Sequence, residues 1–336
     1  MDYEGSIRGK KILFLAPSFF GYENKIKLKM IEMGAIVDFY DVRSVTSAFE
    51  KALLKISPNI FTIKTSKYYD KILRENKGKD YDFVFIVKCD MISCQILDRI
   101  RKNYKNAFFC LYLWDSIKNI QGIHAKFKYF DRVLSFDRID AKNNKGIIFR
   151  PLFFLDEYRR TKVCPTENEY QFDLSFLGTI HSDRFAIIKE IRKICDDWGL
   201  KFFSFQYLQS GFMYYCYKIL KNEFRETSKN DFNYEKLESV NIAEIVDKSK
   251  VILDIQHPQQ TGLTMRTIEM IGMNKKLITT NQDIKNYDFY DPYNILVIDR
   301  KNIKIPKEFF DAEYRPIDEK IYEKYYIESW INDILH

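Results

Sequence analysis

The chain has 336 residues, 46% hydrophobic and 30% charged, with a formal net charge of +7 and six cysteines. This composition is typical of a globular protein rather than a disordered one, and the length favours two domains over one. The mild basic excess suits small anionic partners or acidic lipid head groups. Because no zinc-finger spacing or RNA-binding signature occurs, we expect no nucleic acid partner.

The cysteines are scattered without a C-x-x-C pair, which is typical of reduced thiols in a cytoplasmic protein. The first eleven residues lack an apolar signal core, and no run reaches the ~18 apolar residues that a membrane span needs. We therefore expect a cytoplasmic protein, with peripheral contact at the cytoplasmic membrane face as an additional option.

The first half of the chain alternates apolar runs with amphipathic segments, as Rossmann-like α/β domains do. The expected strands are 10–17, 35–40, 82–88, 107–114, 131–137 and 147–153. The expected helices are 23–34, 92–104 and most of 45–76.

Gly21 lies in the loop after the first strand, and that loop lacks the full G-x-G-x-x-G spacing, so a tight turn competes with a ligand-binding role. Asp80-Tyr81-Asp82 spells D-x-D, but it precedes its strand, whereas a metal-binding D-x-D follows one. We interpret it as polarity at the entry of a strand. The four histidines form no metal-ligand spacing, so we predict no metal site.

Trp114-Asp115-Ser116 follows the apolar strand 107–114, at the carboxyl edge where sites form in parallel sheets. Asp115 is our candidate for the base that deprotonates a hydroxyl nucleophile. The alternative is that it caps the following helix or anchors an arginine. Asp137 ends the next strand, and there helix capping is the favoured role.

The polar segment Asp156–Gln171 contains Pro165 and has no sustained periodicity, so it is the candidate interdomain linker. A second α/β series follows it. Its expected strands are 172–177, 200–207, 251–255, 277–280 and 295–298, and its expected helices are 185–198, 242–248, 264–273 and 319–335.

Gly178, Thr179, His181 and Arg184 occupy the corner between a strand and the next helix, where backbone N–H groups favour phosphate. The alternative for Arg184 is an ion pair with Glu190 or another surface acid.

The aromatic-rich segment Ser210–Phe232 is expected mainly to pack in the core. An acceptor-facing or membrane-facing surface is the alternative.

The stretch from Lys250 to Asn281 reads as strand, loop, helix and strand, which is a βαβ unit with parallel strands. Met265, Ile268 and Ile271 are spaced for one buried helix face. The loop before that helix supplies the second set of candidate ligand-binding residues: His257, Gln260, Thr261, Gly262, Leu263 and Thr264. Thr261 or Thr264 is the expected N-cap, and His257 has a local turn role beside Pro258 as its alternative.

Arg266 and Glu269 share a second face of that helix. A guanidinium near the helix start and a carboxylate one turn later fit a nucleoside diphosphate, with the cation on phosphate and the carboxylate on ribose hydroxyls. The alternative is an exposed ion pair worth a few tenths of a kcal/mol.

The thirty residues of this stretch resemble the donor-binding βαβ element of GT-B glycosyltransferases, particularly bacterial enzymes of capsule and lipopolysaccharide assembly. Many of those enzymes carry two glutamates eight positions apart, and the second one holds the donor ribose. Glu269, before MIGMNKKLITT, matches the second glutamate, whereas Thr261 stands at the first.

The resemblance implies two Rossmann-like domains facing across a cleft: an acceptor-side domain at 1–157, a donor-side domain at 158–314, and a terminal helix at 315–336 that packs back on the first. On the acceptor side it implicates Gly21, Trp114, Asp115 and Ser116.

The implied activity is metal-independent transfer of a hexosyl-type sugar from a nucleotide sugar to a surface-polysaccharide or lipid-linked glycan acceptor. In it Arg266 stabilises the leaving diphosphate and Asp115 serves as base. The rival functions are a polyol-phosphate transferase and a non-catalytic sugar- or nucleotide-binding subunit.

Overall fold

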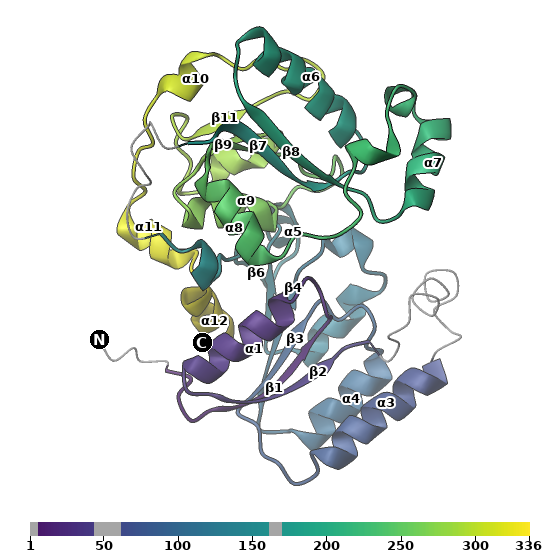
Figure 1. Cartoon of the computed structure of the whole chain (residues 1–336). Helices are drawn as coiled ribbons and strands as arrows, with labels where there is room; N and C mark the ends of the chain where they lie inside the picture. Colours follow the sequence, from purple (N-terminus) through teal and green to yellow (C-terminus); the bar gives the residue numbers. More distant parts are fainter. Residues whose placement is uncertain (1–5, 44–61, 161–169) are drawn as a thin grey trace. The chain divides into compact units, whose positions relative to one another are not determined.

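The computed structural model describes residues 6–43, 62–160 and 170–336, and the chain divides into two compact units (Figure 1). Unit 1 comprises Met1–Pro151 and Ile327–His336, and unit 2 comprises Leu152–Tyr326. The helix expected within 45–61 and part of the expected linker lie outside the described residues.

Unit 1 contains a parallel six-stranded sheet in the order β2-β1-β3-β4-β5-β6. Its strands are β1 (Lys11–Ala16), β2 (Ile36–Asp41), β3 (Phe83–Val87), β4 (Phe108–Leu113), β5 (Arg132–Ser135) and β6 (Ile147–Phe149). The strand order reverses between β1 and β3, and ligands of open α/β sheets bind outside the carboxyl ends of strands at such a switch point.

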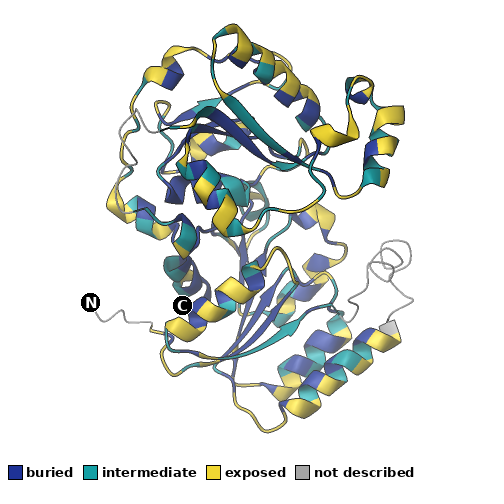
Figure 2. Cartoon of the chain, viewed as in Figure 1, coloured by how far each residue is buried: buried dark blue, intermediate teal, exposed yellow. Residues whose placement is uncertain are grey.

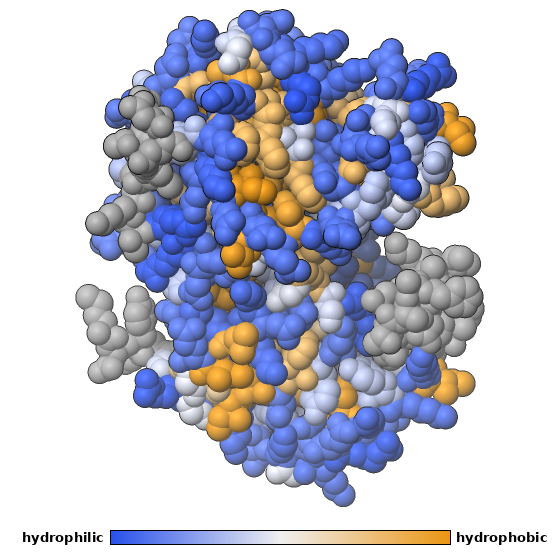
Figure 3. Space-filling view, viewed as in Figure 1, coloured by the Kyte–Doolittle hydropathy of each residue, from blue (hydrophilic) through white to orange (hydrophobic). Residues whose placement is uncertain are grey.

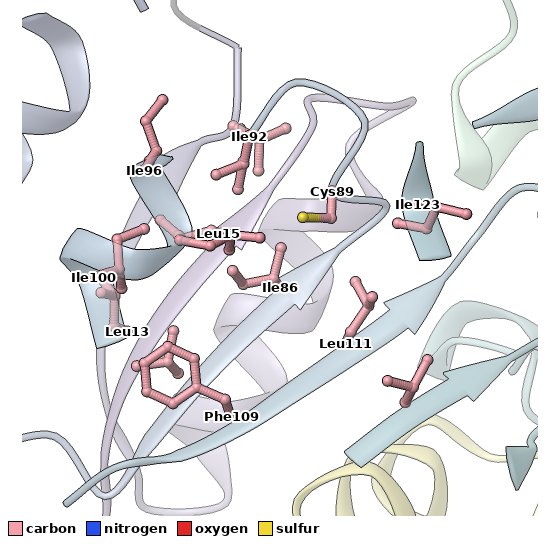
Figure 4. Close-up of a cluster of buried hydrophobic side chains, with 14 of the residues drawn as sticks. Leu13, Leu15, Ile86, Cys89, Ile92, Ile96, Ile100, Phe109, Leu111 and Ile123 are labelled. Carbon is pink, nitrogen blue, oxygen red and sulfur yellow. The ribbon is translucent and has the colours of Figure 1, made fainter. Parts of the chain in front are cut away.

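The helices of unit 1 cover both faces of this sheet. They are α1 (Tyr22–Glu32), α3 (Thr62–Glu75), α4 (Cys94–Asn103), α5 (Arg138–Asn143) and α12 (Ile327–Leu335), with 3-10 turns at Ile117–Asn119 and Ile123–Tyr129. Leu13, Ile86 and Leu111 of the central strands belong to one buried cluster with Ile96 and Ile100 of α4 (Figure 4). Burying each of these side chains stabilises the unit by about 1.5–3 kcal/mol.

Unit 2 contains a parallel five-stranded sheet in the order β11-β10-β9-β7-β8, and its order reverses between β7 and β9. Its strands are β7 (Phe172–Thr179), β8 (Phe202–Tyr207), β9 (Ser249–Asp254), β10 (Lys276–Thr279) and β11 (Ile295–Val297). Its helices are α6 (Arg184–Asp197), α7 (Gly211–Leu220), α8 (Ser239–Asp247), α9 (Met265–Gly272), α10 (Glu308–Asp311) and α11 (Glu319–Lys324), with 3-10 turns at Asp156–Tyr158, Asn222–Phe224, Lys229–Asp231 and Gln282–Asn286.

The predicted βαβ unit is confirmed as β9-α9-β10, with Ile252 opposite Leu277 in a parallel pair. The prediction that α9 buries a single face is wrong, because every residue from Thr267 to Gly272 is buried (Figure 2). A Cβ atom on Gly272 would lie 2.5 Å from the Phe154 ring, so glycine is required for this close approach.

The single helix expected over 319–335 is also wrong, since α11 ends at Lys324 and α12 begins at Ile327. The backbone between them pairs with a distant segment: the Phe154 N–H donates to the Tyr325 carbonyl at 2.8 Å, and Phe154 forms a β-bridge with Tyr326. Beyond this break, Trp330 of α12 is fully buried in unit 1 against Tyr112, at a ring distance of 4.8 Å. No helix in the described ranges has both the length and the apolar character needed to cross a membrane.

Candidate functional site

Arg184 links the carboxyl ends of β7 and β9, at the switch point of the unit 2 sheet. Its Nε donates to the Ile255 carbonyl at 2.5 Å, and its Nη1 donates to the Thr179 carbonyl at 2.8 Å. The alternative of an ion pair with Glu190 or another surface acid is wrong for the described residues, since the partners of this guanidinium are carbonyls. A Cβ on Gly178 would lie 3.0 Å from the Phe176 ring and 3.4 Å from Arg184 Nη1, so the tight contact there is with Phe176.

Arg300, just beyond β11, reaches the same corner and was not singled out from the sequence. Its Nη1 donates to both carboxylate oxygens of Asp183, at 2.8 and 2.9 Å, and its Nη2 donates to the Gln256 carbonyl. Asp183 is the N-cap residue of α6. Arg300 therefore joins the exits of β7, β9 and β11. A charged residue shortly after a predicted strand is the sequence signal that could have identified Arg300.

Charged groups of both signs surround Arg184: the carboxylates of Asp254 and Asp183 and the guanidinium groups of Arg300 and Arg266. Burial lowers the pKa of the Arg184 guanidinium, and the nearby charges of Arg300 and Arg266 lower it further, while Asp254 and Asp183 act in the opposite direction. Asp183 pairs with Arg300 and Glu269 with Arg266, and an anionic ligand would add a further partner for the three guanidinium groups. The corner is thus suited to a phosphate or diphosphate.

The two predicted histidines of this corner lie together, with His181 and His257 ring centroids 5.4 Å apart. The His257 Nδ1 accepts from the Gln259 N–H at 3.2 Å, and the His257 carbonyl accepts from the Gln260 N–H at 2.9 Å. His257 therefore has the local turn role that is its alternative. With Nδ1 accepting, the neutral His257 ring carries its proton on Nε2, which is then a donor. Burial, followed by the charges of Arg184 and His257, lowers the pKa of His181 to about 4.

Replacing His181 should change how stability depends on pH. Its folded pKa of about 4 lies below the ordinary 6.5, so on acidification the unfolded chain binds a proton first. The stability that the neutral ring contributes is complete above pH 6.5 and is lost as the pH falls towards 4. We expect the Tm of wild type to drop more between roughly pH 7.5 and 5 than the Tm of His181→Asn. The exposed His124, changed to Asn, is the control and should keep the wild-type dependence. Identical pH profiles for wild type and His181→Asn would contradict the perturbed pKa.

The start of α9 is fixed to the end of β9 by Asp254, a buried carboxylate not singled out from the sequence. Asp254 Oδ2 accepts from the Thr264 hydroxyl at 2.8 Å and from the Thr267 hydroxyl at 2.5 Å. Thr264 is confirmed as the N-cap, since its Oγ1 accepts from the Thr267 N–H at 3.1 Å. The N-terminus of α9, with its partial positive charge, is therefore held at the same sheet edge as Arg184.

The loop between β9 and α9 is braced through its own carbonyls. The Gln260 side chain donates to the Gly262 carbonyl at 2.9 Å, and Asn281, after β10, donates to the Thr261 carbonyl at 3.1 Å. Gly262 and Leu263 are buried, whereas Thr261, at the position of the absent first glutamate, is exposed. These contacts give the loop a defined backbone path beside the corner.

Arg266 and Glu269 form an ion pair with 2.7 Å between Nη1 and Oε2, but the alternative of an exposed ion pair is wrong. The Glu269 side chain is 3% exposed and the Arg266 side chain 18%. Tyr158 is buried against both: burial and the Glu269 charge raise the pKa of its hydroxyl, and the Arg266 charge opposes them. A buried ion pair is costly to desolvate, which is a reason to look for a role beyond stability.

Gly21 in unit 1 forms a tight turn. It has φ +81° as the N-cap residue of α1, and Phe20 before it has φ +53°. The turn leaves the Phe19 and Phe20 side chains 49% and 62% exposed. Trp114, after β4, lies 6.4 Å from the Phe19 ring. Exposed aromatic rings thus gather at the carboxyl edge of the unit 1 sheet, near its switch point.

Asp115 has three partners in the structure, and these contacts give it the structural role that is the alternative to catalysis. Its Oδ1 accepts from the Ser116 N–H and from the Asn119 side chain, both at 2.9 Å, and its Oδ2 lies 3.3 Å from the Lys88 ammonium. Lys88 has φ +77°, a strained backbone conformation of the kind that gathers at functional sites. Asp115 is one-third exposed, so one face of its carboxylate remains open to solvent.

The other carboxylates noted in unit 1 serve local structure. Asp82 of the D-x-D accepts from the Lys11 N–H at 2.8 Å and from Lys10 Nζ at 3.1 Å, which confirms polarity at strand entry. Asp137 is confirmed as a helix cap, accepting from the first N–H groups of α5. The Ser116 hydroxyl donates to Asp140 at 3.1 Å. Among residues 6–43, 62–160 and 170–336, no cluster of three or more His, Cys, Asp or Glu side chains has a metal-binding arrangement.

No protein-family model and no curated protein sequence matches the chain. Its fold is nevertheless similar to that of solved structures along almost its whole length. Anabaena HepE in complex with UDP-glucose aligns with a TM-score of 0.62 at 10% identity, over 97% of this chain and 98% of that one. An α-glucosyltransferase in complex with UDP and a 13-mer DNA aligns with a TM-score of 0.61 at 13% identity, over 97% and 100%. The lipopolysaccharide outer core galactosyltransferase WaaB aligns with a TM-score of 0.51 at 14% identity, over 97% and 99%.

The chain contains two successive α/β units with parallel sheets, and both are covered by the structural alignments. This arrangement is the GT-B fold of glycosyltransferases. The fold class predicted from the sequence is confirmed.

Proposed function

We propose that this chain is a glycosyltransferase that moves a sugar from a nucleoside diphosphate donor to a surface-polysaccharide or lipid-linked glycan acceptor without a metal ion. The observation that supports it best is the gathering of Arg184, Arg300 and Arg266 at the switch point of the unit 2 sheet, beside the capped N-terminus of α9. Two similar structures hold UDP or UDP-glucose, so a uridine nucleotide is the donor to test first.

In sugar transfer, the bond between the anomeric carbon and the diphosphate oxygen breaks while an acceptor hydroxyl oxygen attacks that carbon. The leaving diphosphate gains negative charge, and the acceptor hydroxyl gives up a proton. Cations and helix N–H groups already oriented towards the diphosphate stabilise this charge without reorganising. Arg184, Arg300 and Arg266 would supply the cations in unit 2, and Asp115 of unit 1 is the candidate base.

The proposal is tested by incubating the purified chain with a panel of nucleotide sugars and measuring both binding and release of nucleotide. Turnover of a sugar nucleotide supports sugar transfer. Turnover confined to a nucleotide-linked polyol favours a polyol-phosphate transferase. Tight binding without any turnover, with or without glycan acceptors, favours a binding subunit, for which Thr261 in place of the first glutamate is a supporting feature.

Replacing Glu269 should weaken nucleotide binding. In the proposal its carboxylate binds the ribose and holds Arg266, whose Nη1 lies 2.7 Å from it. We expect Glu269→Ala to lose on the order of 1–3 kcal/mol of nucleotide binding free energy in calorimetric titration. Glu190→Ala, which removes an exposed carboxylate of α6, is the control and should bind as wild type does. Unchanged nucleotide affinity in a folded Glu269→Ala protein would remove the ribose role.

Chelation should leave the activity intact. The proposed stabilisation of the diphosphate comes from guanidinium groups and helix N–H groups, so no divalent ion is needed to balance its charge. We expect equal rates before and after dialysis against EDTA. A complete loss of activity that magnesium or manganese restores would overturn the metal-independent mechanism.

A further inference from the structure

The helix α7 projects from unit 2 with one side anchored in the core. It starts at Ser210, whose hydroxyl accepts from the Met213 N–H at 3.3 Å. Tyr214 is buried and packs on Phe232 at a ring distance of 5.8 Å, and Phe232 stacks on Phe224 at 5.4 Å. Core packing, the favoured expectation for this aromatic segment, is confirmed for these three residues. It fixes the orientation of the helix.

The opposite side of α7 is apolar and exposed. Phe212, Tyr215, Ile219 and Leu220 are between 57% and 80% exposed. Phe212, Tyr215 and Ile219 share one helical face, since residues three, four and seven positions apart lie on the same side, and Leu220 extends the exposed apolar surface at the end of the helix. Figure 3 shows apolar surface at α7, on the right of the view. Exposed apolar patches on a helix whose other side is anchored mark an interaction surface.

Lysines border this apolar face. Lys218 Nζ donates to the Thr227 carbonyl at 2.8 Å, and Lys221 Nζ donates to the Ser182 carbonyl. Lys229 lies at the other end of the helix, with Nζ 3.1 Å from the position of a Cβ on Gly211. Residues 210–222 contain no acidic side chain, and within the described residues no carboxylate pairs with these three lysines. Lys218 and Lys229 are exposed beside the apolar face, whereas Lys221 is half-buried and is held by the Ser182 carbonyl.

We propose that α7 is an interfacial helix that docks unit 2 onto a phospholipid bilayer containing anionic lipid. Aromatic and aliphatic side chains on one face, bordered by lysines, are the composition of a helix that lies in the headgroup region. The apolar side chains enter the acyl boundary, while the lysines stay at the level of the anionic headgroups. A second copy of the chain is a poorer occupant, because an isologous contact would bring the lysines of both copies together.

Helix α7 is linked to the candidate site, because Lys221 Nζ donates to the carbonyl of Ser182 in the loop between β7 and α6. A bilayer bound by α7 would lie beside the corner that holds His181 and Arg184. Docking does not depend on the sugar-transfer proposal, since vesicle binding and nucleotide-sugar turnover are measured separately.

The test is cosedimentation of the full chain with vesicles of phosphatidylcholine alone or mixed with phosphatidylglycerol. We expect binding to the mixed vesicles that weakens as salt rises. The variant Phe212→Ser/Ile219→Ser/Leu220→Ser should bind at least about tenfold more weakly, because it removes most of the inserted apolar surface. The matched control, Leu28→Ser/Ile63→Ser/Val240→Ser, removes three apolar side chains that are also exposed but lie outside α7, and it should bind as wild type does.

Circular dichroism and nucleotide binding should be unchanged in both variants, since the replaced side chains are exposed. If the triple variant unfolds, Ile219→Ser alone takes its place, with an expected loss of about threefold. Three outcomes would overturn the proposal: no binding of wild type to the mixed vesicles, equal loss in the α7 and control variants, or self-association in sedimentation velocity that the α7 substitutions abolish while vesicle binding is absent.

Discussion

Arg266→Ala should lower kcat by roughly 10²–10³ while raising the donor KM less, the loss seen when one preorganised donor is removed from a developing anion. Arg266 stands in the first turn of α9, where its charge adds to that of the helix N-terminus. The leaving diphosphate is more negative in the transition state than in the ground state, so the contact is stronger when the bond breaks. Initial rates across a donor titration separate the two constants.

The buried Glu269 complicates this experiment, because Arg266→Ala leaves its carboxylate without the guanidinium 2.7 Å away. An unpaired buried charge is itself destabilising. The double variant Arg266→Ala/Glu269→Gln removes that charge as well. If the double variant regains wild-type kcat, the loss came from the orphaned carboxylate, and Arg266 has no role at the diphosphate. If the double variant is slower than Glu269→Gln alone, with a near-normal Tm, the proposed role stands.

Asp115→Asn should abolish transfer while leaving donor binding near wild type. The substitution suits the structure, because the Asn oxygen can still accept from the Ser116 N–H and the Asn119 side chain. The negative charge, the proton-accepting capacity and the contact with the Lys88 ammonium are lost. General bases contribute about 10²–10⁴ in rate, so transfer should fall to that extent. Transfer kinetics give the rate, and a separate donor titration gives the donor affinity.

The matched control for this experiment is Asp90→Asn. Asp90 is the second carboxylate near Lys88, at 3.6 Å, so its loss perturbs the same ammonium without touching Asp115. We expect Asp90→Asn to transfer sugar at close to the wild-type rate. Near-normal transfer by Asp115→Asn would instead make that carboxylate an anchor for Lys88 and the following turn. Equal losses of transfer rate in both variants would indicate that the altered environment of Lys88, and not the loss of a base, slows transfer.

Local features were predicted where neighbouring residues decide them. The apolar run Val251–Ile255, the loop with Gly262 and a cap at Thr261 or Thr264 together predicted β9, the start of α9 and the parallel partner β10. The caps at Thr264 and Asp137, and the position of Asp82 before its strand, follow from backbone N–H groups within a few residues or from the adjacent strand. Such contacts join residues that are close in sequence or on adjacent strands, so they can be predicted from the sequence.

Errors arose where distant segments compete with local preference. The pattern of Glu319–Leu335 predicts one helix, but a backbone bond and a bridge to Phe154 interrupt it after Lys324. Helical spacing put Glu269 on a polar face, but Tyr158 from a remote 3-10 turn buries it. An isolated helix pattern contains no information about which segment will cover it.

The sequence by itself determined the succession of strands and helices, the parallel βαβ units and the polar residues at strand ends, because periodicity and capping are local properties. Only the tertiary structure decided which of those residues meet. It joined Arg184 to the carbonyls after β7 and β9, brought in Arg300 from beyond β11, and left one face of α7 uncovered. The reason is that strand order, not sequence order, sets which strand ends are neighbours, and the reversal between β7 and β9 is a property of the whole sheet.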